Sequence, residues 1–245
     1  MWTKGLVIQR IDWNEQLFSL RIKADIEPFT AGQFIKLSEM RDGKRIARAY
    51  SLVNPPDSDY LEVLAIKVEQ GLLSPNLHSL QLGDCIEVSS RASGFMVLDE
   101  VPEGKHLWLL GSGTGIGPYF SMLETAAVWQ RFEKIVLVYA VSYAQDIAYQ
   151  PLIDKYKAQY AEQFIFQAMV TREVYPDALK SRIPLAIANG VLERAVGLEF
   201  KVDNSQVIIC GNPEMIADAQ RELEHKALIK NLRRKPGQIT VERYW

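Results

Sequence analysis

The chain has 245 residues, of which 48% are hydrophobic and 24% are charged, and its formal net charge is −2. This composition is typical of a globular protein with two domains or one large one, and it gives no general attraction to nucleic acid or to an anionic membrane. With two cysteines and three scattered histidines, the chain cannot build a four-cysteine zinc site or an iron–sulfur cluster, and we expect no metal.

Nothing in the sequence predicts a targeting or membrane segment. Lys4, Arg10 and Asp12 interrupt the first apolar residues, so these lack the core of a signal peptide. No apolar stretch reaches membrane-spanning length without a glycine or a charge. We therefore expect a cytoplasmic protein with neither membrane nor nucleic acid among its partners, and a monomer because no additional interface element is visible.

Short apolar runs separated by turn signals fill residues 6–90. The expected strands are Leu6–Arg10, Gln16–Ile22, Gln33–Leu37, Ala47–Leu52, Leu61–Val68 and Cys85–Ser89. Turn residues such as Asp42-Gly43 lie between them. Six short strands at this spacing predict an antiparallel barrel or sandwich.

The fourth of these strands carries the sequence Arg48-Ala49-Tyr50-Ser51. Strand alternation places Arg48 and Tyr50 on one face and Ala49 and Ser51 on the other. An arginine can bind a phosphate through two parallel hydrogen bonds, and a tyrosine offers a flat surface to an aromatic ring. Taken alone, the four residues fit an edge strand with a solvated arginine and a core tyrosine better than they fit a ligand-binding site.

A second motif, Gly71-Leu72-Leu73-Ser74-Pro75, precedes a short predicted helix that extends through Leu80. We expect Ser74 to cap this helix and Pro75 to be its first residue. Free N–H groups at a helix start can bind an anion. A capped surface helix without a ligand would give the same pattern.

Residues 107–122 predict a buried strand, a glycine turn and a helix. The strand is Leu107–Leu110, and the helix begins near Pro118. The glycines of the turn alternate with other residues: Gly111, Gly113, Gly115 and Gly117. Such a turn binds phosphate in many α/β domains, although neither the G-x-G-x-x-G nor the Walker pattern fits and a turn without a ligand is the alternative.

Beyond Val101–Gly104, the expected joint between two domains, strands alternate with helices. The strands are expected at Leu107–Leu110, Ile135–Val141, Phe164–Val170 and Val207–Cys210. This order predicts a parallel sheet with helices on both faces and a ligand beyond the carboxyl ends of the strands.

The residues after the second and third of these strands bear on the choice of nucleotide. An NAD-selective domain often has an acid after the second strand, but here Ser142 follows and the first acid is Asp146. Thr171 and Arg172 follow the third strand, and Arg182 comes later. A missing acid and two arginines favour the 2′-phosphate of NADP, so we expect a preference for NADPH that Arg172→Ala narrows.

The last strand leads into Cys210-Gly211-Asn212-Pro213-Glu214-Met215. We expect Asn212 to cap a helix that runs to about Lys230, with Pro213 in its first turn and Glu214 at its positive end. A lone cysteine such as Cys210 is most often a small buried apolar residue.

Three motifs occur here in the order and at the intervals of the ferredoxin–NADP reductase family. They are Arg-x-Tyr-Ser at 48–51, Gly-x-Leu-Ser at 71–74 and Gly-Thr-Gly-Ile-Gly-Pro at 113–118. The terminal Tyr244-Trp245 is similar to the enterobacterial-type branch of the bacterial ferredoxin (flavodoxin)–NADP reductases, although it could also end an ordinary last strand. The chain resembles this family over essentially its whole length.

The resemblance implies two domains. Residues 1–100 would form an N-terminal antiparallel six-stranded β-barrel that binds FAD. Residues 101–245 would form a C-terminal α/β parallel-sheet domain that binds NADP(H), with a tail that returns to the flavin.

The resemblance also implies roles for individual residues. Arg48 and the backbone of Leu72, Leu73 and Ser74 would hold the FAD pyrophosphate, Tyr50 would stack on the isoalloxazine, and Ser51 would bond near its N5. Further FAD contacts are implied for Ala49, Leu64, Ala65, Ile66, Thr114, Tyr244 and Trp245. NADP contacts are implied for Gly113, Gly115, Ser142, Thr171, Arg172, Arg182, Asn212, Pro213 and Glu214.

Four residues are implied to be catalytic: Ser51, Cys210, Glu242 and Tyr244. Cys210 would shape the geometry of hydride transfer, and Tyr244 would block the nicotinamide until it moves. Relatives often carry an arginine where this chain has Ser142, so the strictness of the NADP preference stays open.

The implied function is electron transfer between NADPH and ferredoxin or flavodoxin through FAD. The basic run Lys230, Arg233, Arg234 and Lys235 is either a solvated surface or a patch that steers an acidic carrier. Two alternatives remain. One is a reductase of the same fold that acts on free flavins or quinones, and the other is a non-catalytic flavin-binding subunit of an electron-transfer complex.

Overall fold

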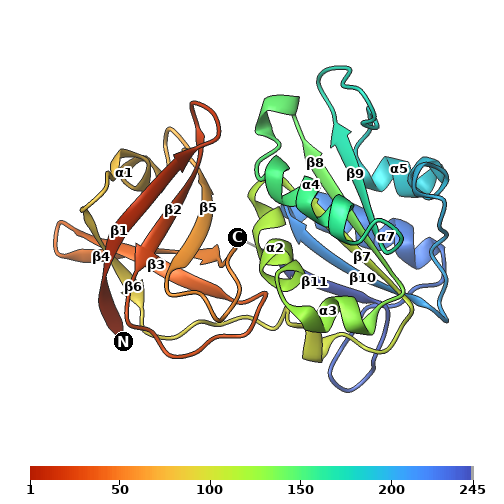
Figure 1. The fold of residues 1–245 in the computed structure, drawn as a ribbon, viewed down its shortest axis with the longest axis horizontal. Coiled ribbons are helices and arrows are strands. Elements are labelled where there is room, and N and C mark those ends of the chain that lie inside the picture. Colours follow the sequence, from red (N-terminus) through yellow and green to blue (C-terminus); the bar gives the residue numbers. More distant parts are fainter. Residues whose placement is uncertain (244–245) are drawn as a thin grey trace. The chain divides into compact units, whose positions relative to one another are not determined.

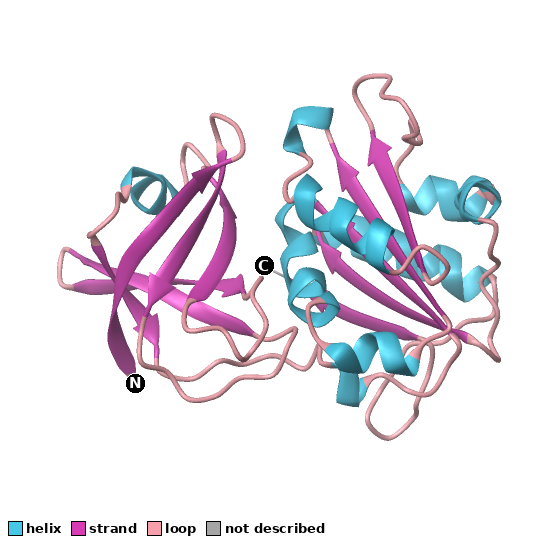
Figure 2. Ribbon diagram, viewed as in Figure 1, coloured by secondary structure: helices cyan, strands magenta, loops and turns pink. Residues whose placement is uncertain are grey.

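The structure, a computed structural model, describes residues 1–243, except for the side chain of Arg243. Contacts divide the chain into two compact units. The first contains Met1–Val97 and Gly117–Thr125, and the second contains Leu98–Ile116 and the residues from Ala126 onward. Figures 1 and 2 show a β-sheet in each unit.

The first unit contains a six-stranded antiparallel sheet in the order β4-β3-β6-β1-β2-β5. Its elements are β1 (Trp2–Asp12), β2 (Leu17–Lys23), β3 (Phe34–Arg41), β4 (Lys44–Ser51), β5 (Leu61–Ile66), α1 (Ser74–Ser79) and β6 (Cys85–Ser89). The two edges meet just after β4, where Leu52 pairs with Val63 and the Val53 N–H donates to the Glu62 carbonyl at 2.8 Å. The sheet therefore closes at this point into the predicted barrel.

Alternating apolar residues fill the barrel interior. Phe18, Leu20 and Ile22 point inward from β2, and Val63 and Ala65 do so from β5. This period of two is what a strand with one buried face requires.

The second unit contains a five-stranded parallel sheet in the order β11-β10-β7-β8-β9. Its strands are β7 (His106–Ser112), β8 (Lys134–Val141), β9 (Phe164–Val170), β10 (Ser205–Gly211) and β11 (Ile239–Arg243). The four predicted parallel strands are present, and β11 adds a fifth. The strand order reverses between β7 and β10, and such a switch point is where open α/β sheets bind ligands.

Short helices connect these strands. They are η1 (Leu98–Glu100), η2 (Gly113–Ile116), α2 (Gly117–Leu123), α3 (Ala126–Arg131), η3 (Ala144–Asp146), α4 (Gln150–Gln159), α5 (Ile183–Ala188), α6 (Val191–Val196) and α7 (Pro213–His225). Helices of the second unit cover both faces of its sheet (Figure 2), as the alternation of strands and helices predicted.

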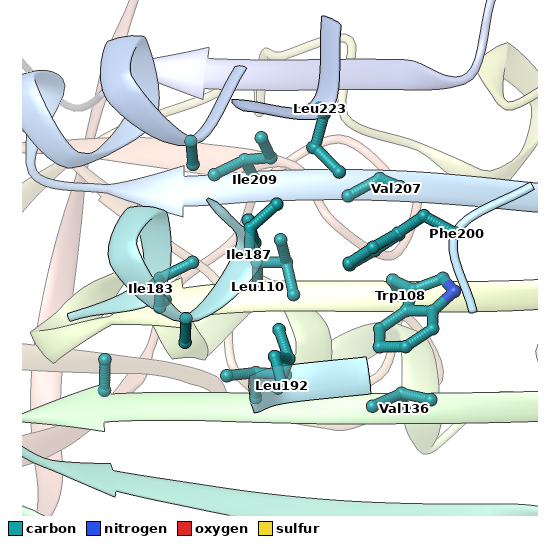
Figure 3. Close-up of a cluster of buried hydrophobic side chains, with 14 of the residues drawn as sticks. Trp108, Leu110, Val136, Ile183, Ile187, Leu192, Phe200, Val207, Ile209 and Leu223 are labelled. Carbon is teal, nitrogen blue, oxygen red and sulfur yellow. The ribbon is translucent and has the colours of Figure 1, made fainter. Parts of the chain in front are cut away.

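One face of the parallel sheet packs against α5, α6 and α7. Trp108 and Leu110 of β7 meet Ile187 of α5 and Leu223 of α7 in one buried cluster (Figure 3). The Trp108 ring also packs against Phe200, with 4.1 Å between the ring centroids. This packing holds β7 and β10, whose carboxyl ends border the switch point.

Two helix boundaries differ from the prediction. Ser74 is not the cap of α1: Leu73 holds that position, and the Ser74 hydroxyl instead accepts a bond from the Val68 N–H at 3.1 Å. The helix predicted near Pro118 is present and begins at Gly117. It ends at Leu123, where the N–H and the hydroxyl of Thr125 donate to the Met122 carbonyl at 3.0 and 2.7 Å.

The second difference is at the end of α7. This helix ends at His225, well before Lys230, because Ala227 adopts a left-handed φ of 67°. A left-handed residue of this kind interrupts the helical hydrogen-bond pattern.

Candidate functional site

In the first unit, Ser51 ends β4, where it is paired with Phe34 of β3. Its side chain is buried, with 4% of the residue exposed, and its hydroxyl oxygen has no hydrogen-bond partner among the described residues. A buried hydroxyl without a partner costs free energy, so this atom is suited to bond a polar atom of a bound molecule.

Arg48 and Tyr50 lie on the opposite face of β4 from Ser51, as alternation predicted. Tyr50 is paired with Ile35 and packs against the barrel core. Burial raises the pKa of Tyr50 to about 12, although the Arg48 charge opposes the shift. The Arg48 guanidinium donates to the Ala47 carbonyl at 2.8 Å and remains exposed, which leaves further donors for an anion.

The segment between β5 and α1 carries the other predicted flavin contacts. Leu64 and Ala65 are buried and Leu73 is almost fully buried, whereas Ile66 and Leu72 expose 42% and 52% of their surface. The bond between Ser74 and Val68 holds the two ends of this segment together. An orphaned polar atom and exposed apolar side chains near the barrel rim fit a large, partly apolar ligand.

In the second unit, the glycine turn that follows β7 packs against the turn that follows β10. A Cβ atom on Gly115 would lie 2.6 Å from Gly211 Cα, and one on Gly211 would lie 2.2 Å from Ser112 Oγ. Gly113 and Gly211 also have positive φ values of 55° and 132°. Neither Gly115 nor Gly211 therefore has room for a side chain. No atom lies within 4 Å of a Cβ placed on Gly113, so the backbone at that position is open to a phosphate.

The start of α7 continues this edge of the sheet. The Asn212 side chain accepts bonds from the N–H groups of Glu214 and Met215 at 2.9 and 3.1 Å, so Asn212 is the predicted cap. The Asn212 N–H in turn donates to Ser112 Oγ at 3.1 Å. Ser112 is a residue that the sequence reading missed, because nothing in the sequence shows that β7 and β10 are neighbours.

The carboxyl ends of β8 and β9 bring Ser142, Thr171 and Arg172 together. The Thr171 N–H donates to the Val141 carbonyl at 3.1 Å, and the Arg172 N–H donates to the Ser142 carbonyl at 3.0 Å. The Arg172 guanidinium lies 5.7 Å from the centroid of the Tyr143 ring, a cation–π contact. Arg182 is exposed at the start of α5, beyond the loop that follows β9.

Cys210 and Glu242 lie beside each other, because they are paired in the register of β10 and β11. Cys210 is fully buried, and Thr114, in the turn η2, is partly buried. Tyr244 and Trp245 lie outside the described residues, so their predicted contacts with the flavin stay predictions.

Along residues 1–243, no helix combines the length and apolar character that crossing a membrane requires. In the same part of the chain, no three His, Cys, Asp or Glu side chains are grouped so that they could hold a metal ion.

Two family descriptions match the two halves of the chain. The oxidoreductase FAD-binding domain matches residues 6–95, and the oxidoreductase NAD-binding domain matches residues 109–221. Together with the closed barrel, the parallel sheet and the glycine turn, they define an oxidoreductase with one flavin-binding and one nicotinamide-nucleotide-binding domain.

Individual relatives narrow this class. The flavodoxin/ferredoxin–NADP reductase of Escherichia coli is 45% identical over 245 residues, which cover the whole chain and 99% of that protein. The ferredoxin–NADP reductase of Azotobacter vinelandii is 32% identical and covers 94% of the chain and 93% of its own length. A crystal structure of a ferredoxin–NADP⁺ reductase from Neisseria gonorrhoeae with bound FAD and NADP superposes with a TM-score of 0.93 at 30% identity, covering 100% of this chain and 99% of that one. The chain therefore belongs to the flavodoxin/ferredoxin–NADP reductase family, and its cofactors are FAD and NADP(H).

Proposed function

We propose that this protein transfers electrons between NADPH and ferredoxin or flavodoxin through FAD. The observation that carries the proposal is the full-length match at 45% identity to a flavodoxin/ferredoxin–NADP reductase. The close packing of Gly115 against Gly211 at the switch point supports it from the structure. So does the buried Ser51 hydroxyl, which has no hydrogen-bond partner among the described residues. FAD, when bound, accepts a hydride and returns electrons one at a time.

In this proposal residues 1–100 bind the flavin. Tyr50 supplies a flat ring, Arg48 supplies donors for a phosphate, and the buried Ser51 hydroxyl at the end of β4 supplies a hydrogen bond. The backbone of Leu72 and Leu73, with Ser74, adds contacts at the rim. Ala49, Leu64, Ala65, Ile66 and Thr114 complete the proposed flavin contacts.

Residues 101–245 bind the nucleotide in the same proposal. Gly113 and Gly115 let the pyrophosphate approach the backbone, and the start of α7 at Asn212, Pro213 and Glu214 lies at the same edge of the sheet. Ser142, Thr171, Arg172 and Arg182 act at the adenosine end, where guanidinium groups favour the 2′-phosphate. Cys210 and Glu242 are the proposed catalytic pair of this unit, and Tyr244 is the proposed gate.

The partner is proposed to bind transiently to a monomer in the cytoplasm, steered by positive charge. The basic run at 230–235 is one candidate for this role, although Arg233 pairs with Glu100 at 3.2 Å. Exposed charges attract an acidic carrier over a distance that salt shortens, so a steered reaction slows as ionic strength rises.

The test is NADPH-dependent turnover of the purified holoprotein with flavodoxin, with ferredoxin and with ferricyanide, each at several salt concentrations. We expect turnover with a protein carrier to fall steeply with salt, and turnover with ferricyanide to respond much less. Faster reduction of free FMN than of either protein carrier would instead identify a flavin reductase. If none of these acceptors supports oxidation of NADPH, the proposal is contradicted.

A further inference from the structure

Glu173 crosses from the loop after β9 to the loop after β8. Its Oε1 atom accepts a hydrogen bond from the Ala144 N–H at 2.5 Å. The preceding residue, Arg172, donates its own N–H to the Ser142 carbonyl at 3.0 Å. Two consecutive residues of one loop therefore fix the backbone of the other on both sides of Tyr143.

The contact brings a carboxylate from the loop after β9 to the backbone that follows β8. Asp146, the first acid after β8, accepts a bond from the Tyr143 N–H at 3.1 Å within its own turn η3. Glu173 adds a second carboxylate, which is only partly buried and is adjacent in sequence to the Arg172 guanidinium. The edge of the sheet that follows β8 and β9 thus combines a cation and an anion.

These two charges act oppositely on the group that distinguishes NADPH from NADH. The 2′-phosphate carries close to two negative charges near neutral pH, whereas the 2′-hydroxyl of NADH carries none. A guanidinium stabilises the phosphate, and a carboxylate raises its free energy. Carboxylates at this end of the sheet are also the groups with which NAD-selective domains bond the ribose.

We propose that Glu173 limits the preference for NADPH over NADH while holding the β8 loop in place for both nucleotides. This inference rests on the proposed function and names the residue that sets the nucleotide selectivity. Glu173 is a positioning residue through its bond to Ala144 and a specificity determinant through its charge. The two roles separate because glutamine keeps the acceptor atom and loses the charge.

The experiment compares holoprotein variants Glu173→Gln and Glu173→Ala in steady-state kinetics with NADPH and NADH. In E173Q we expect the KM for NADPH to fall about threefold to fivefold, as removal of one partly screened charge implies, and the KM for NADH to stay unchanged. In E173A the hydrogen bond is lost as well, so we expect the KM for both nucleotides to rise with little change in kcat. Calorimetric binding of adenosine 2′,5′-bisphosphate and of ADP gives the same comparison without turnover.

Asp177 offers a matched control in the same loop. It is exposed, and its carbonyl accepts a bond from the Gln167 side chain at 3.1 Å, upstream of the end of β9. Its φ of 59° is left-handed, a conformation that asparagine tolerates. Asp177→Asn therefore removes one negative charge from the loop without touching the β8 loop, and we expect the selectivity ratio to stay at the wild-type value.

An E173Q enzyme with an unchanged ratio of the two KM values would overturn the inference, as would one that loses affinity for both nucleotides like E173A. Equal effects of E173Q and D177N would also overturn it, because they would reflect net charge alone. A wild-type protein that binds neither adenosine 2′,5′-bisphosphate nor ADP and oxidises neither nucleotide would overturn the proposed function itself.

Discussion

The Ser51 hydroxyl combines two properties that rarely occur together, since it is buried and has no hydrogen-bond partner in the described chain. Removing such a hydroxyl stabilises the protein without ligand, because a buried polar atom without a partner costs free energy. In the protein with bound flavin, the same substitution removes a hydrogen bond. Stability and activity should therefore respond in opposite directions.

For Ser51→Ala we expect the apoprotein to unfold at an equal or higher urea concentration. We expect the rate of flavin reduction by NADPH in the holoprotein to fall by about threefold to tenfold, the kinetic equivalent of one neutral hydrogen bond. Ser38→Ala is the control: Ser38 is buried in the same barrel, but its hydroxyl is bonded to Arg45 at 2.6 Å. Ser38→Ala should lose stability and keep its rate of flavin reduction. Slower reduction in Ser38→Ala, with an unchanged rate in Ser51→Ala, would contradict the role of Ser51.

His106, at the start of β7, should make stability depend on pH. Burial lowers the pKa of His106 below its ordinary value, with Glu133 opposing and Lys105, Lys134 and Lys201 adding to the shift. Well above pH ~6.5, His106 is neutral in both the folded and the unfolded chain, so its full contribution to stability is present there. As the pH falls below that value, the unfolded chain takes up a proton first and stability is lost until the folded pKa is passed.

Urea unfolding at pH 7.5 and pH 5.5 measures this effect. We expect the wild-type protein to lose stability between the two values, and His106→Gln to lose less. His225, on the exposed surface of α7, supplies the control substitution His225→Gln. If H106Q retains the full wild-type pH dependence, burial of His106 is not its cause.

At the level of elements, the glycine turn after β7 gives two substitutions with opposite expectations. A Cβ on Gly115 would overlap the backbone of Gly211 at 2.6 Å, whereas one on Gly117 would meet its nearest atom, Val53 Cγ2, at an ordinary 3.4 Å. Backbone has little freedom to yield, so the first change must displace a turn and the second need not.

We expect Gly115→Ala to lower the free energy of unfolding by about 2 kcal/mol or more and to abolish tight nucleotide binding. Gly117→Ala should be neutral, or stabilising by up to about 1 kcal/mol, because it removes flexibility from the unfolded chain. Thermal unfolding of the two holoproteins, with and without NADP⁺, checks both expectations. Equal unfolding temperatures and equal responses to NADP⁺ in the two variants would show that contact with Gly211 is not the reason for a glycine at position 115.

The sequence predicted these elements well where one local pattern decides them. Short apolar runs between turn residues located the six barrel strands, and the Asn212-Pro213-Glu214 start of α7 follows directly from cap chemistry. The prediction from sequence failed where a contact with a more distant residue determines the role of a side chain. At Ser74, the hydroxyl accepts a hydrogen bond from the Val68 N–H and does not cap α1. Glu173 is the same case at the site, because its acceptor role depends on β8 and β9 being neighbours.

For the whole molecule, the sequence predicted two sheets of different type but not how the chain is shared between them. By sequence position, residues 117–125 follow the glycine turn and belong to the second half. Their contacts group them with the first unit, where the Ser121 hydroxyl donates to the Asn54 carbonyl at 2.7 Å. No local pattern reveals that residues 117–125 group with the first unit, because the grouping depends on a buried hydrogen bond between residues far apart in the sequence.

The order of strands in the parallel sheet also lay beyond the sequence. Alternating strands and helices predict a parallel sheet but not its reversal between β7 and β10 or the pairing of β11 beside β10. That pairing places Glu242 next to Cys210. The motifs located the candidate site along the chain, and the topology brought together the members that lie in the second unit.

The central claim, that this chain is an FAD enzyme reduced by NADPH, is tested most directly by an anaerobic absorbance titration of the purified protein, first with NADPH and then with NADH. We expect a yellow protein whose flavin absorbance is bleached stoichiometrically by NADPH, and bleached less readily by NADH. A yellow protein that neither nucleotide bleaches would contradict the claim and leave a flavin-binding subunit without this activity. A colourless protein that takes up no FAD would contradict the flavin site itself.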